Sequence, residues 1–208
     1  MTKKRERTIE LMKNAQEEFA SEYELIIVPE IMSKKVVAYG AMRYDLELIL
    51  QYLELLKQKN DDIYASALTY SIIALYGKCF TDATEGKYPK LEPNSIFEDR
   101  PDLRKQHDYF MDLRHKFIAH RGKTDDEIGI SYIAVSKNEP NKAKLKYRQL
   151  KLSGFAKDKL EKFEELFTFV FETLNKKFAK AGNKVYDGML NTFSKEDLNN
   201  FTFTNLKK

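Results

Sequence analysis

The sequence predicts a mainly α-helical protein, a bundle of four or five helices with one small inserted β-hairpin. Apolar residues recur at intervals of three and four over four long stretches, which is the period of an amphipathic helix. Residues 128–152 instead alternate apolar and polar side chains around a turn, which is typical of a hairpin. The 208 residues are 42% apolar and 33% charged, the composition of an ordinary globular protein.

The first half of the chain predicts three helices. The first covers about residues 4–20, and the short apolar segment 25–28 before Pro29 predicts a bend or a brief strand. A long helix then runs from about residue 33 or 41 to residue 59. Its buried stripe consists of Leu46, Ile49, Leu50, Leu53 and Leu56. The next helix, about 61–81, is apolar on nearly every side, so we expect it at the centre of the bundle.

The second half begins with a loop, because residues 84–95 are rich in turn-forming types. A helix follows from about Asp99 to Gly122, with Pro101 in its first turn and the glycine just after its end. Its apolar line is Leu103, Phe110, Leu113 and Phe117.

Two strands are expected near 128–132 and 145–152, joined by a turn at 137–141. A last helix covers about 155–180 and ends at Gly182. We therefore expect one helical domain over residues 1–182, with the hairpin at about 128–152, and a polar C-terminal tail, 183–208, that packs loosely.

Composition limits the class of protein. The single cysteine, Cys79, excludes an internal disulfide and is expected to be a small buried apolar residue. The most apolar window is about ten residues long, whereas a membrane span needs roughly 20. We expect a soluble, cytoplasmic protein that does not bind membranes. The net charge of +4 does not by itself indicate nucleic acid.

Two of the three histidines lie close to one arginine, in the segment 112–122. Arg114 is followed directly by His115, and His120 comes after five intervening residues. An arginine can hold two phosphate oxygens at once, and a histidine can carry a proton near neutral pH. This pairing of residue types points to chemistry on phosphate.

The segment Arg114–Arg121 resembles the motif of the HEPN superfamily, small helical-bundle domains of which many are metal-independent ribonucleases. That motif is an arginine, a polar residue, three to five further residues, and a histidine. Here His115 fills the polar place and His120 the last, and the ending Ala119-His120-Arg121 is typical of bacterial members.

The resemblance implies a homodimer in which the two motif helices meet across the two-fold axis and form one composite site that cleaves RNA. The ribose 2′-hydroxyl attacks the adjacent phosphate, and neither a metal nor another cofactor is expected. Arg114 and His120 would be the chemical pair, with His115 in support. Many such proteins are toxins or act in phage defence, so an antitoxin or regulatory protein is an expected partner.

Helix geometry is consistent with a shared site. In a straight α-helix His120 lies about 120° around the axis from Arg114 and about 9 Å along it, so one chain does not easily bring both to one phosphate. A symmetry-related helix from a second chain would bring an arginine and a histidine to the same phosphate. His120 would also lie in the last helical turn, where unpaired carbonyls favour a histidine cation suited to a general acid.

Some features separate the chain from parts of the family. Members silenced by a nucleotidyltransferase carry a tyrosine two residues after the histidine, and here that place is Gly122. Other members bind without cutting. The alternative function is therefore a non-catalytic module that binds nucleotide, RNA or a protein partner.

Other candidate sites are weaker. His107-Asp108 matches metal-dependent HD phosphohydrolases, but those need an earlier histidine and His107 is the first. It is expected to cap a helix or lie at the edge of the core. Asp112-x-x-His115 has the spacing of a di-iron helix, which needs a second such helix. No metal site is expected.

Several cations are candidates for contacts with RNA or phosphate. Lys116, Arg121 and Lys123 flank the motif, and Lys78 either meets the end of its own helix or points to phosphate. Five cations from Lys142 to Lys151 lie mainly on the second strand, with Tyr147 available for stacking. Four of them alternate and would face one side: Lys142, Lys144, Lys146 and Arg148. A row of cations on one face is also what a solvated strand edge requires, and we favour that interpretation.

Overall fold

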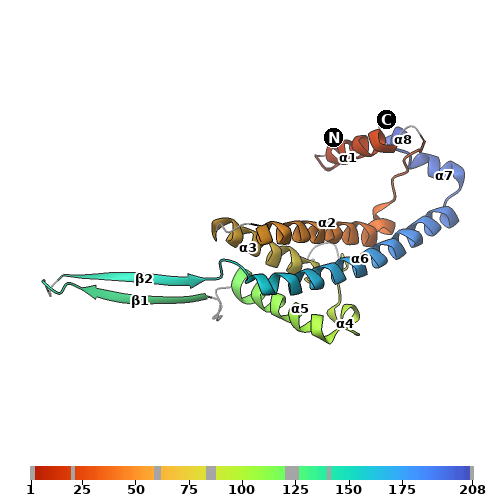
Figure 1. The fold of residues 1–208 in the computed structure, drawn as a ribbon. Helices are drawn as coiled ribbons and strands as arrows, with labels where there is room; N and C mark the ends of the chain where they lie inside the picture. Colours follow the sequence, from red (N-terminus) through yellow and green to blue (C-terminus); the bar gives the residue numbers. More distant parts are fainter. Residues whose placement is uncertain are drawn as a thin grey trace. The chain divides into compact units, whose positions relative to one another are not determined.

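A computed structural model describes residues 3–19, 22–58, 62–82, 88–119, 127–139 and 142–206. Over these ranges the chain is mainly helical with one small antiparallel sheet, as the sequence predicts (Figure 1). The long helices are α1 (Lys3–Phe19), α2 (Glu30–Gln58), α3 (Asp62–Cys79), α5 (Pro101–Leu113) and α6 (Lys157–Thr192). None of the described helices combines the length and the apolar composition needed to cross a membrane.

The chain divides into two compact units. One comprises residues 1–39 and 176–208, and the other comprises residues 40–175. Both α2 and α6 contribute residues to each unit. The motif segment belongs to the second unit.

The second unit has a core of aromatic and aliphatic side chains from four helices. In α2, the predicted stripe is buried at Leu46, Ile49, Leu53 and Leu56. Rings from three other helices meet: the ring centroid of Phe110 in α5 lies 5.4 Å from that of Tyr76 in α3 and 5.1 Å from that of Phe167 in α6. Burial of these side chains is the main term that holds the helices together.

Helix α3 departs from the prediction in its first half. Its buried residues run only from Thr69 to Cys79, whereas Ile63 and Tyr64 are 81% and 56% exposed. The even distribution of apolar residues around α3 predicted burial on nearly every side, and this is wrong for the first two turns. A short helix, α4 (Pro93–Ile96), lies in the segment predicted as loop.

The first unit shows a second departure. The last helix does not end at Gly182 but continues to Thr192, because apolar residues keep helical spacing through Ala181, Val185 and Met189. A glycine inside a helix costs only about 1 kcal/mol relative to alanine, so it need not stop one.

The C-terminal residues are folded in the same unit. Ser194 caps α7 (Lys195–Asn200), and α8 (Phe203–Leu206) follows, with Phe203 buried. The Ile27 N–H donates to the carbonyl of Phe201 at 2.8 Å, and the Phe203 N–H donates to that of Leu25 at 2.9 Å. The segment 25–28, predicted as a bend or a brief strand, thus contains a single antiparallel bridge, and the predicted polar tail contains two short helices.

The predicted hairpin is present, as β1 (Glu127–Val135) paired antiparallel with β2 (Ala143–Lys151). Its register sets Ile128 opposite Leu150, Tyr132 opposite Lys146 and Ile133 opposite Leu145. All described residues of the two strands are exposed to solvent.

Candidate functional site

The motif segment follows directly from α5, which begins where the sequence predicts. Pro101 takes the first helical position, where its missing N–H costs nothing. Leu103, Phe110 and Leu113 are buried on one side of the helix. Burial of these three side chains fixes the position of the backbone just before Arg114.

From Arg114 to Ala119 the chain is a π-helix rather than an α-helix. The Arg114 N–H still reaches the carbonyls of Phe110 and Met111, so the widening begins at the motif itself. The angle and rise of an α-helix therefore do not hold from Arg114 to Ala119. Single π-helical turns inside α-helices are frequent at functional sites.

The stem of Arg114 lies directly against the backbone of α3. A Cβ atom placed on Gly77 would lie 2.6 Å from Cγ and 2.9 Å from Cδ of Arg114. Only glycine permits this approach, since real Cβ contacts are essentially never that short. The arginine is half-buried, and its stem is held at a defined place on the helix.

The guanidinium of Arg114 reaches its neighbour in the motif. Its Nη1 lies 3.4 Å from Nδ1 of the exposed His115, a long contact in which the guanidinium can act only as the donor. Lys116 forms an ion pair with Asp112 at 2.7 Å, with both side chains about half exposed. Such a surface pair contributes little to stability and leaves the lysine accessible.

Lys78, next to Gly77, forms an ion pair with Asp45 of α2 at 2.8 Å. The two partners differ in environment, because the Asp45 side chain is 9% exposed and the Lys78 side chain 65% exposed. Lys78, predicted to meet the end of its own helix or to contact phosphate, is thus paired with a buried carboxylate while most of its side chain is exposed. Gly77 and Lys78 thus join α3 to both Arg114 and α2.

Cys79 is the last residue of α3. It is fully buried, as predicted for a small apolar residue. Burial and, to a smaller extent, the nearby Asp45 carboxylate raise the pKa of its thiol to about 12, and Lys78 partly opposes them. The thiol is therefore not a nucleophile at neutral pH.

His107 lies in the core and not in the motif's surroundings. It is 2% exposed, and its ring centroid lies 4.4 Å from that of Phe80 and 5.0 Å from that of Phe97. Its Nδ1 is 2.9 Å from the Tyr76 hydroxyl. The pKa of His107 is lowered to about 4, mainly by burial; Asp108 opposes this shift and Arg104 adds to it. The ring is neutral near pH 7 and serves packing.

Three predicted residues, His120, Arg121 and Lys123, lie outside the described residues. Of the predicted site, the structure brings together Arg114 and His115. It adds Gly77 and Asp45, which the sequence did not single out. A glycine between Tyr76 and Lys78 within an apolar helix is the one sequence signal that could have indicated a close approach at this position.

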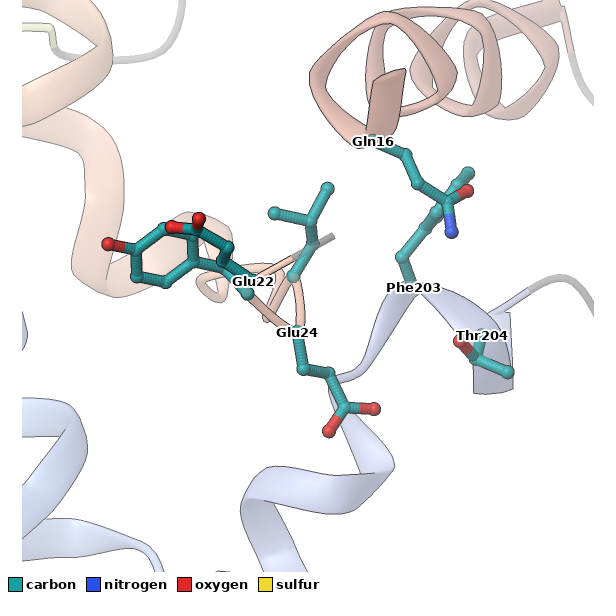
Figure 2. A pocket seen from close by; sticks show the side chains of 7 residues that line it. Gln16, Glu22, Glu24, Phe203 and Thr204 are labelled. Carbon is teal, nitrogen blue, oxygen red and sulfur yellow. The ribbon is translucent and has the colours of Figure 1, made fainter. Parts of the chain in front are cut away.

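In two other pockets the acidic side chains do not form a common site. One, of about 330 Å³, is lined by Gln16, Phe203, Thr204 and the segment 22–25 (Figure 2). Figure 2 shows the Glu22 and Glu24 side chains extending away from each other. A second, on α6, is acidic, but its Glu164 and Glu165 are ion-paired with Lys57 and Arg100. No metal-binding cluster occurs among the residues that the structure describes.

The chain was compared with family models, curated proteins and solved structures, and nothing matches it in any of the three comparisons.

Proposed function

We propose that the protein is a metal-independent endoribonuclease of HEPN type, a helical bundle active as a homodimer. Arg114 and His120 are its chemical pair and His115 supports them. Lys116, Arg121, Lys123 and Lys78 add positive charge for the RNA backbone. The biological setting we propose is a toxin or phage-defence enzyme of the cytoplasm.

The observation that carries the proposal is the fixed position of the Arg114 side chain. Its stem lies on Gly77, its Nη1 lies 3.4 Å from His115, and the chain around it is π-helical. A cation with a defined position costs little reorganisation when negative charge develops on a substrate. A surface arginine with only a solvating role needs no glycine beneath its stem.

The chemistry follows from these residue types. One histidine accepts the proton of the ribose 2′-hydroxyl while that oxygen bonds to phosphorus. The bond from phosphorus to the 5′-oxygen then breaks, and a second histidine donates a proton to the leaving oxygen. In a homodimer, the two copies of His120 supply both roles. Arg114 stabilises the charge on the phosphorane oxygens through paired N–H groups.

The test is cleavage of total cellular RNA in the presence of a chelator, with the new ends mapped. We expect 2′,3′-cyclic phosphate and 5′-hydroxyl ends. Arg114→Ala and His120→Ala should each lower the rate by about 100-fold or more, the usual effect of removing a group that stabilises the transition state. Retention of cleavage in either variant refutes the assignment.

The control variant is Arg104→Ala. Arg104 also lies on α5 and is partly exposed, but it is ion-paired with Asp108 at 2.9 Å. Its loss should leave cleavage unchanged. If the wild-type protein binds RNA without cutting it, the protein is the non-catalytic module instead.

A further inference from the structure

The hairpin exposes many apolar side chains. On β1, the fractions exposed range from 40% for Tyr132 to 65% for Ile133, and on β2 Leu145 is 76% exposed. Ile128, Ile130, Val135, Tyr147 and Leu150 are exposed as well. An isolated two-stranded hairpin is at best marginally stable in water, and three or more strands with an apolar face are needed for stability.

Charge is distributed unequally between the two strands. β2 carries Lys144, Lys146, Arg148 and Lys151. In β1 the one charged residue is Glu127, at its first position. Lysine on an edge strand is a common device that prevents pairing with another chain. The outer edge of β2 therefore has this protection, and the outer edge of β1 does not.

The edge of β1 is also unpaired. The sheet of the described residues has the order β1–β2 and no third strand, and Figure 1 shows the two strands with no further strand beside them. Beyond Glu127, residues 128–135 form an exposed, uncharged and mainly apolar edge that offers backbone N–H and C=O groups to a further strand. The occupant must suit an apolar surface without charge.

We propose that the outer edge of β1 pairs antiparallel with β1 of a second copy of this chain, about a two-fold axis near Ser131, and forms a four-stranded sheet. In this register Ile130 lies opposite Tyr132 of the partner subunit, and the reverse pair repeats it. Such pairs of a β-branched and an aromatic residue stabilise a sheet. Both apolar faces of the hairpin continue across the axis.

The alternative pairing through β2 is disfavoured by charge. An antiparallel β2–β2 contact centred on Lys146 would set that lysine against its own copy, and Lys144 against the partner's Arg148. Like charges directly opposite each other destabilise a sheet. The same cations remain on the outer strands of the proposed sheet, where they face solvent.

The experiment measures self-association of the full chain by sedimentation equilibrium. Ser131→Lys and Ser131→Glu each place like charges opposite each other, so the dissociation constant should rise about fivefold or more in each variant alone. An equimolar mixture of the two variants should restore association, because lysine then faces glutamate. Gln149→Lys, on the same face of β2, is the matched control and should associate as the wild type does.

Three outcomes overturn the inference: a monomeric wild type, undiminished association of both Ser131 variants, or no recovery in the mixture. Circular dichroism shows that each variant is folded, and recovery in the mixture excludes misfolding of the hairpin as the cause. A monomer whose binding of single-stranded RNA is lost in Lys146→Glu would instead make the hairpin a nucleic-acid surface. The inference does not depend on ribonuclease activity: a dimer that is sensitive to the Ser131 variants but leaves RNA intact refutes only the proposed function. RNA cleavage by a dimer that neither Ser131 variant weakens refutes only the inference, and a monomeric wild type refutes both.

Discussion

The contact between Gly77 and Arg114 leads to a quantitative prediction about stability. In Gly77→Ala the new methyl group would lie 2.6 Å from Cγ of Arg114, and 3.3 Å from its Cβ. Because Cγ is near the backbone, rotation of the end of the side chain does not relieve the clash. The arginine or the helix must move.

Two opposing terms set the size of the effect. Overpacking of a well-packed contact costs about 1–3 kcal/mol. Alanine inside a helix gains about 0.5–1 kcal/mol over glycine. We expect Gly77→Ala to destabilise the wild-type protein by about 1 kcal/mol. In the Arg114→Ala background Cγ and Cδ are absent, so the same change should be neutral or stabilising.

The assay is urea denaturation followed by circular dichroism for the wild type, both single variants and the double variant. The double-mutant cycle should give a coupling free energy of about 1–2 kcal/mol. Gly182→Ala is the control, since a Cβ there meets no atom within 4 Å. It should stabilise the protein whichever residue is at position 114. Additive effects of Gly77→Ala and Arg114→Ala, within about 0.5 kcal/mol, refute the packing argument.

Two further predictions concern buried groups. The pKa of His107 is about 4 in the folded state and 6.5 in the unfolded state. As the pH decreases below 6.5, the unfolded chain therefore binds more protons than the folded protein, and the free energy of unfolding decreases. Between pH 7 and pH 5 the loss measured by urea denaturation should be at most about 2 kcal/mol. This loss should be absent in His107→Phe. If the stability of that variant depends on pH as the wild type does, the loss does not come from His107. Lys78→Ala leaves the Asp45 carboxylate buried without its cation and should cost about 1–3 kcal/mol in the same assay. Lys116→Ala, which breaks a pair exposed on both sides, should cost under about 1 kcal/mol; equal losses in the two variants would contradict the argument.

The fold was predictable where side-chain periodicity reports packing. Four members of the predicted stripe, Leu46, Ile49, Leu53 and Leu56, are buried, and Leu50 is half-buried. The line of Leu103, Phe110 and Leu113 is buried as its spacing indicates. The hairpin followed from alternation and a turn. In each case a local pattern is tied to one buried or exposed face, so one sequence window contains the information.

The features that escaped prediction depend on contacts between distant segments or on small energy differences. The π-helix at Arg114 has no local sequence signature, and the partner of Gly77 lies 37 positions along the chain. Asp45 gave no sign that it would be buried against Lys78. Gly182 weakens a helix by less than the packing of Ala181 and Met189 strengthens it.

Cys79 makes the packing around Arg114 accessible to measurement without any substitution. It is the only cysteine of the chain, it is 0% exposed, and it lies two positions from Gly77. A thiol reagent can modify it only when this end of α3 opens, so the labelling rate reports the free energy of that opening. Slower labelling on addition of a non-cleavable RNA analogue would show that RNA binding and the packing of this helix end are thermodynamically linked.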